Sequence, residues 1–143
     1  MLPGLHPLAV HFPVALTLSA WLLLGAAAVT RGRFARLLAI GGTLNICLAA
    51  ALALVALATG LGAVLDLSVT AAAHEAISRH SKWALFSTCA LLLVAVWRGA
   101  GVPAAARPSP VYLVVLTGVA AALVVTALHG HQNVFQFGIG VAR

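Results

Sequence analysis

Charged side chains are scarce in this sequence. Only 7% of its 143 residues are Asp, Glu, Lys or Arg, and just two of them are acidic. A soluble domain carries about 25% charged residues, so the composition excludes an ordinary soluble enzyme and a disordered protein. Two cysteines are too few for a disulfide scaffold. The net charge of +6 comes from scattered Lys and Arg residues that form no basic face, so nucleic acid is not an expected partner.

Apolar side chains dominate instead. Hydrophobic residues make up 63% of the chain, and the mean hydropathy is +1.12. A lipid bilayer is the solvent that suits such a composition. Long apolar runs predict four membrane spans, at about residues 5–30, 37–59, 76–98 and 111–129. The third needs its helix to extend back through `HEAISRHSK`, which contains no Pro or Gly. We expect an all-α four-helix transmembrane bundle that forms a single domain over residues 1–143.

Basic residues between the spans predict how the bundle is oriented. The first and third connections contain no acid, and their arginines are Arg31, Arg33, Arg36, Arg98 and Arg107. The positive-inside rule places these connections in the cytoplasm, so both termini should lie on the outer side. The C-terminal `VFQFGIGV` alternates apolar residues with Gln and Gly. This period of two predicts a short extended tail at the outer interface.

Histidines collect in the outer half of this predicted topology. Three separate spans bring one imidazole each to a similar height. His11 lies roughly 30 Å from the inner connection, and His80 and His129 lie roughly 27 Å from it, by the rise of an α-helix. An ionisable group inside a membrane indicates a functional site. His6 and His131 are expected at the interface. His6 also lies about 140° around a helix from His11, so the two do not share a face.

Three kinds of chemistry suit imidazoles on different helices. A b-type haem takes two axial histidines, and His11, with His80 or His129, is the predicted ligand set. Arg79 and Lys82 are then candidates to bind the propionates, although Arg79 can also pair with Glu75 four residues earlier. A Cu or Zn site would use imidazoles from the same group, namely His11, His74, His80 and His129. A proton relay or a base that deprotonates quinol is the third alternative.

Two stretches resemble a known family. Residues 5–16, `LHPLAVHFPVAL`, resemble the motif HP-x-x-VHFP that opens the first span of DUF2231, a bacterial family of small four-span membrane proteins. `ATGLGAVLD` at residues 58–66, His80, and the glycine-containing end at 138–141 are similar to its later motifs. The resemblance implies a four-span fold in the bacterial inner membrane. Family relatives adjoin or are fused to c-type cytochrome domains, which implies electron transfer as the setting.

The sequence therefore supports one main hypothesis and two alternatives. The main hypothesis is a membrane electron-transfer protein that holds haem b near the outer leaflet and passes electrons between quinol and an outer redox partner. That partner would be a c-type cytochrome or a larger respiratory complex. The alternatives are a non-catalytic accessory subunit of a larger membrane complex and an outward-facing Cu or Zn protein. No nucleophile–base–acid set, phosphate loop or carboxylate pair occurs, so an enzymatic activity is not assigned.

Overall fold

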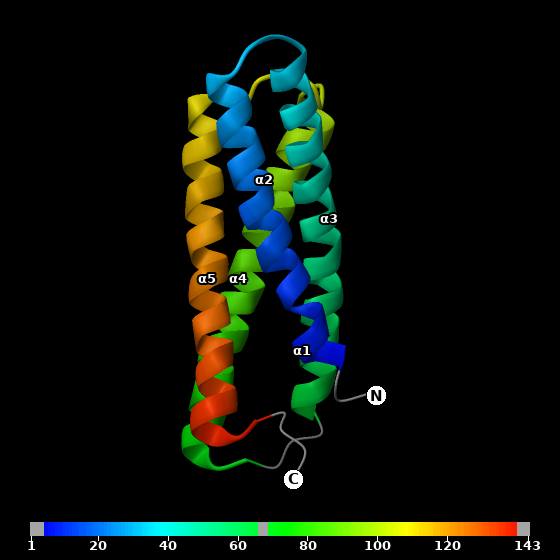
Figure 1. Ribbon diagram of the computed structural model, residues 1–143. Helices are drawn as coiled ribbons and strands as arrows, with labels where there is room; N and C mark the ends of the chain where they lie inside the picture. Colours follow the sequence, from blue (N-terminus) through cyan, green and yellow to red (C-terminus); the bar gives the residue numbers. More distant parts are fainter. Residues whose placement is uncertain (1–4, 66–68, 140–143) are drawn as a thin grey trace.

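Four long helices run antiparallel along one bundle (Figure 1). The computed structural model describes residues 5–65 and 69–139. A short helix, α1 (Leu5–Ala9), leads into α2 (His11–Val29), which is followed by α3 (Gly32–Leu65), α4 (Ala71–Gly101) and α5 (Pro110–Phe137). The four are long and apolar enough to cross a membrane, with α1 and α2 counted together as one span of 25 residues. The predicted all-α bundle is confirmed.

A small break separates α1 from α2. The amide of Val10 still donates to the His6 carbonyl at 3.1 Å, so the backbone remains close to helical. Pro13 has no amide hydrogen to donate to the carbonyl four residues earlier, and its ring crowds that carbonyl. The break therefore lies one turn before Pro13, and α1 continues the direction of α2 (Figure 1).

Three of the helices, α3, α4 and α5, extend beyond the predicted spans, whereas the first span ends at Val29, close to the prediction. Residues 32–36 of `RGRFAR`, expected in a connection, form the first turn of α3, because nothing after Gly32 stops the helix. At the C-terminal end, α5 continues through Phe137, and Gly138 ends it in the left-handed conformation, with φ of 64°. The extended tail is thus wrong for residues 134–137: their alternation lies on a helix that glycine terminates. Residues 140–143 lie outside the described part.

Each long helix contacts two neighbours, in the ring order α2, α3, α4, α5. Two hairpins, α2–α3 and α4–α5, therefore make up the bundle. Its core is built from fully buried Leu24, Ile46, Leu91 and Leu116, with many alanines between them. Small residues let helices approach closely. At Gly42 the approach is so close that a Cβ would lie 2.6 Å from Leu24 Cγ.

The two ends of the bundle differ in chemistry. The connections α2–α3 and α4–α5 lie together at one end, which we call the arginine end (Figure 1). The other end holds α1, the end of α3, the start of α4 and the end of α5. We call it the histidine end, because it contains His6, His11, His74, His80, His129 and His131.

Candidate functional site

His6 on α1 reaches into the bundle. Its ring is half-buried, and Nδ1 lies 3.0 Å from the Ala56 carbonyl oxygen and 3.3 Å from the Thr59 hydroxyl on α3. The ring occupies the space beside Gly60, where a Cβ would lie only 2.7 Å from His6 Cε1. Glycine at this position therefore makes room for the imidazole.

His80 on α4 repeats this arrangement in the second hairpin. The ring is half-buried, and Nδ1 lies 3.1 Å from the Thr126 carbonyl oxygen on α5. It packs beside Gly130, where a Cβ would lie 3.1 Å from Cε1. In both hairpins the accepting carbonyl precedes the glycine by four residues, one helical turn. His6 and His80 thus have the same setting on two different helix pairs.

The arrangement fixes which nitrogen of each ring is free. A carbonyl oxygen only accepts, so Nδ1 must carry the proton, and Nε2 of a neutral ring then carries a lone pair. Neither Nε2 makes a hydrogen bond among the described residues. Nδ1–H bound to a backbone carbonyl with Nε2 free is the usual state of a metal-ligating histidine.

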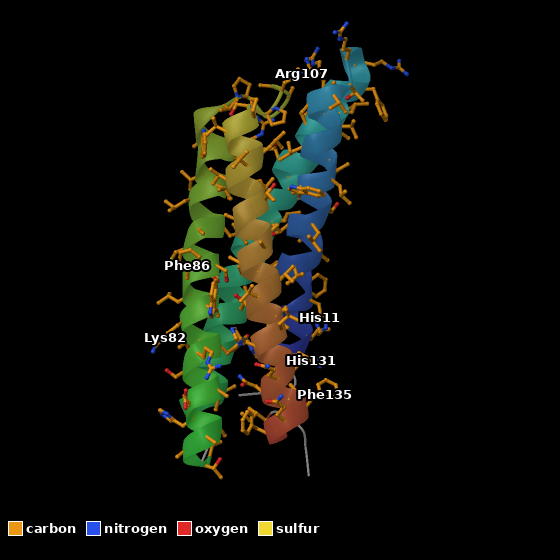
Figure 2. The ribbon with its side chains drawn as sticks, turned by 90° about the vertical axis from the view of Figure 1, so that its left-hand side faces the viewer. His11, Lys82, Phe86, Arg107, His131 and Phe135 are labelled. Atoms are coloured by element: carbon orange, nitrogen blue, oxygen red, sulfur yellow. The ribbon has the colours of Figure 1, made fainter. Side chains whose placement is uncertain are left out.

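His11 lies on the outside of the bundle. Its side chain is exposed, and Nδ1 lies 2.6 Å from the Pro7 carbonyl oxygen of its own helix. In Figure 2 it points away from the helices, on the flank opposite Lys82. The structure does not bring His11 together with His80. The reason is the helical angle between His6 and His11: once one faces inward, the other faces outward.

The remaining predicted residues lie near the surface. His129 is half-buried, with its ring centroid 6.4 Å from that of Trp83 and Nδ1 3.4 Å from Gln132 Oε1. His74 and Lys82 are exposed. Arg79 forms a 3.1 Å ion pair with Glu75, the local alternative to a propionate contact. Glu75, Arg79 and His129 line a hollow of about 280 Å³ between α4 and α5.

A set of three metal ligands is not assembled in the described part of the chain, where no group of three His, Cys, Asp or Glu residues is placed to hold an ion. Instead, the imidazoles of His6 and His80 each have Nδ1 held by a backbone carbonyl and Nε2 free among the described residues. Two would suffice for a haem, whose macrocycle supplies the other four ligands, whereas a structural zinc ion takes four protein ligands. By ligand number alone, two histidines match the axial positions of a haem and fall short of a structural zinc site.

Polar groups continue from His80 toward the middle of the bundle. The Thr126 hydroxyl lies 3.1 Å from the Ser87 hydroxyl. Thr17 Oγ1 on α2 is buried without a hydrogen-bond partner among the described residues, and so is Asn133 Oδ1, one turn from the end of α5. A buried polar atom without a hydrogen-bond partner destabilises the fold, so these two atoms have unused hydrogen-bonding capacity. Below them, the fully buried leucines of the core close the interior.

His6 was missed as a site residue by the sequence analysis. Its signal was present in the sequence, in the pair of glycines Gly60 and Gly130. Each lies within a helix in the histidine half, where a packed imidazole needs a residue without a side chain. Because His6 is close to the N-terminus, its position alone suggested the interface, and only the packing of α1 against α3 places it inside.

The chain matches the family model described as "Predicted membrane protein (DUF2231)" over residues 3–143. No curated protein and no solved structure matches it.

Proposed function

The chain belongs to this family of membrane proteins, and we propose that it is an electron-transfer protein that binds b-type haem through His6 and His80. The observation that carries the proposal is their shared geometry. Each Nδ1 is held by a backbone carbonyl of the neighbouring helix, and each Nε2 is free among the described residues. His80 belongs to the predicted ligand set, and His6 replaces His11 as its partner.

The hydrogen bonds at Nδ1 support axial ligation in two ways. They fix the orientation of each ring, which lowers the entropy lost when Nε2 binds iron. They also make the imidazole more basic, which strengthens it as a ligand. The glycines beside the rings, Gly60 and Gly130, allow both imidazoles to sit between helices without separating them. Bound haem would supply the one-electron chemistry.

The location supports transfer between a quinol and an outer partner. The arginine end contains five arginines and, among the described residues, no acid, so the positive-inside rule directs it to the cytoplasm of a bacterial inner membrane. The histidine end, with its haem, then faces the outer side. A c-type cytochrome or a respiratory complex could receive electrons there, and a quinol could donate them from the bilayer.

Absorption spectra of purified variants test the proposal. The protein is expressed with ample haem, and wild type, His6→Ala, His80→Ala and the matched control His11→Ala are compared, oxidised and reduced. We expect a low-spin haem in wild type and His11→Ala. Loss of one axial ligand should make His6→Ala and His80→Ala high-spin or free of haem. Gel filtration checks that each variant is folded.

Two outcomes contradict the proposal. Unchanged low-spin spectra in both His6→Ala and His80→Ala would remove these residues as ligands, and loss of the low-spin spectrum in His11→Ala would then favour the predicted alternative pair of His11 and His129. A colourless wild type from haem-replete cells would exclude haem binding. Elemental analysis of that sample then distinguishes the Cu or Zn protein from the accessory subunit, which would hold neither metal.

A further inference from the structure

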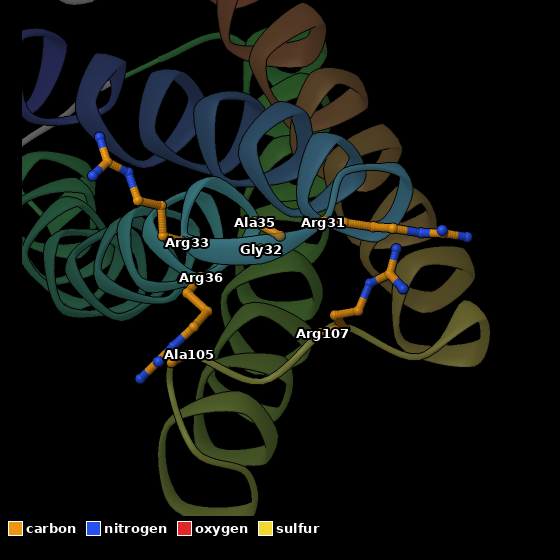
Figure 3. Close-up of a pocket in the computed structure, with 7 residues that line it drawn as sticks. All are labelled: Arg31, Gly32, Arg33, Ala35, Arg36, Ala105 and Arg107. Carbon is orange, nitrogen blue, oxygen red and sulfur yellow. The ribbon is translucent and has the colours of Figure 1, made fainter.

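The arginine end contains a hollow of about 480 Å³ whose charged lining is entirely basic. It is formed jointly by the α2–α3 connection, the first turn of α3 and the α4–α5 connection. Its lining residues are Arg31, Gly32, Arg33, Ala35, Arg36, Ala105 and Arg107. Figure 3 shows Arg31 and Arg107 side by side on one flank of α3, while Arg36 reaches past Ala105 on another.

The positive charge of this hollow has no counter-charge in the described part of the chain. The one acid described there is Glu75, which pairs with Arg79 at the histidine end. The other acid of the sequence, Asp66, lies outside the described residues. Four guanidinium groups around one hollow repel each other unless an anion enters it. The hollow therefore favours a negatively charged ligand from outside the described chain.

Hydrogen bonds hold the walls of the hollow in place. Arg107 donates from Nε to the Ala27 carbonyl at 3.4 Å and from a terminal nitrogen to the carbonyls of Ala28 and Thr30. These are carbonyls of the last turn of α2, where a cation is favoured by the helix dipole. Gly32, with φ of 69°, turns the chain between Arg31 and α3. Arg107 and the turn at Gly32 are thus fixed before a ligand binds.

The surroundings of the hollow are apolar and exposed. Val29 is 81% exposed at the end of α2, and Phe34 and Leu37 are 59% and 62% exposed on α3 beside the arginines. These side chains lie next to the hollow along the sequence and are suited to hydrocarbon. A ligand that is anionic at one end and apolar at the other matches both surfaces, whereas free phosphate matches only the first.

We propose that this hollow binds the headgroup of an anionic phospholipid. Its phosphate would accept paired hydrogen bonds from Arg31, which lies beside Arg107, and the charge of Arg36 would attract the headgroup from the other flank, because guanidinium and phosphate match in a bidentate geometry. Its acyl chains would lie over Val29, Phe34 and Leu37. Basic hollows between transmembrane helices are a known type of lipid site, and each cation near an anionic headgroup raises the affinity about fivefold. This inference does not depend on haem binding.

Native mass spectrometry tests lipid retention directly. The purified whole protein is titrated with phosphatidylglycerol or diphosphatidylglycerol, with phosphatidylcholine as the neutral comparison. We expect both anionic lipids to bind wild type and phosphatidylcholine to bind at least tenfold more weakly. Arg31→Gln/Arg36→Gln should lose about tenfold or more of the affinity for anionic lipid, since two cations are removed. Lys82→Gln and Arg79→Gln together remove the same charge from the histidine end and should leave binding unchanged.

A second variant separates geometry from charge. Arg31→Lys/Arg36→Lys keeps both charges but loses the paired donors, so its affinity should fall between wild type and the Gln pair. Equal binding by wild type and the Gln pair overturns the proposal, as does equal binding of anionic and neutral lipid. Displacement of the lipid by millimolar inorganic phosphate would assign the hollow to free phosphate instead. These readouts measure lipid mass and remain valid whether or not the protein holds haem.

Discussion

Arg98 shows how a single basic residue can serve the fold as well as the topology. It is 2% exposed, although the sequence placed it in a connection. Its Nε donates to the Thr43 hydroxyl at 3.0 Å, and a terminal nitrogen donates to the carbonyls of Ala104 and Ala106. The guanidinium also lies 6.0 Å from the centre of the Tyr112 ring. One side chain thus connects α3, α4, α5 and the α4–α5 connection.

We expect Arg98→Met to destabilise the protein strongly. Methionine fills a similar volume but leaves the Ala104 and Ala106 carbonyls and the Thr43 hydroxyl without this donor. Each buried polar group left unpaired costs about 1–3 kcal/mol, so a loss of about 2–4 kcal/mol is expected after partial access of water. Thermal unfolding in detergent, followed by circular dichroism, measures the change.

Arg98→Lys is the control for charge. Lysine keeps the cation but cannot direct separate nitrogens to Thr43 and to the connection, so its stability should be intermediate. If Arg98→Met unfolds at the wild-type temperature, the hydrogen bonds around Arg98 do not stabilise the fold. If Arg98→Lys is as damaging as Arg98→Met, the planar shape of the guanidinium matters more than its charge.

The histidines show which features of the candidate site can be predicted from the sequence and which cannot. The spacing of His6 and His11 established that only one of them can face a given neighbour. The choice between them was not in the spacing, because it depends on the rotation of α1 against α3. That rotation follows from contacts with Ala56, Thr59 and Gly60, about 50 residues away in the chain. The regular geometry of a helix predicts the angle between the two side chains, and tertiary packing determines which of them faces inward.

At the level of the helices, the sequence predicted the number of spans but underestimated their length. Apolar runs mark the part of a helix that lies in hydrocarbon, whereas helix ends are set by capping and by glycine or proline. The Thr70 hydroxyl accepts from the Ala73 amide at 3.4 Å and starts α4 five residues before the predicted span. Ser109 caps α5 in the same way, just before Pro110. The helices therefore continue through the polar residues beyond the predicted span ends, as far as the capping residues.

The contact between α2 and α3 depends on a glycine with no space for a side chain. A Cβ on Gly42 would lie 2.6 Å and 2.9 Å from two carbons of Leu24 and 3.3 Å from the Ala20 carbonyl oxygen. Leu24 is fully buried, so its side chain has little room to move. This close approach determines how tightly the first hairpin packs, and with it the position of α1 and His6.

We expect Gly42→Ala to destabilise the protein by about 1–3 kcal/mol, the usual cost of overpacking a core. Gly25→Ala on α2 is the matched control, because a Cβ there meets no other atom within 4 Å. Alanine is also the better helix former, by about 0.5–1 kcal/mol, so Gly25→Ala should not lower stability. Thermal unfolding in detergent compares the two. Equal stability of Gly42→Ala and wild type would mean that α2 and α3 can separate without cost.

At the scale of the whole molecule, the two hairpins carry equivalent features. Each has a histidine on its first helical segment that binds a carbonyl of its second helix, beside a glycine one turn further. Each also ends in arginines at the opposite end of the bundle. The two halves thus hold one half-buried histidine each near the same end of the bundle. The proposed haem ligation uses one imidazole from each hairpin.

Orientation in the membrane is the last property that these features predict. The arginine end should face the cytoplasm, because translocating its basic connections is unfavourable, and binding of anionic lipid would reinforce that placement. Ala104 at the arginine end and Ala71 at the histidine end are exposed sites for a single cysteine. Cys47 and Cys89, which are free and exposed, are first replaced by alanine.

A membrane-impermeant maleimide applied to intact spheroplasts then reads the orientation. Ala71→Cys should react in intact spheroplasts, whereas Ala104→Cys should react only after the membrane is opened. The reverse pattern would place His6 and His80 at the cytoplasmic side. A haem held there would exchange electrons with a cytoplasmic partner, so the outer c-type cytochrome would be excluded while the ligand pair remained. The labelling experiment therefore tests the membrane orientation independently of the chemistry of the site.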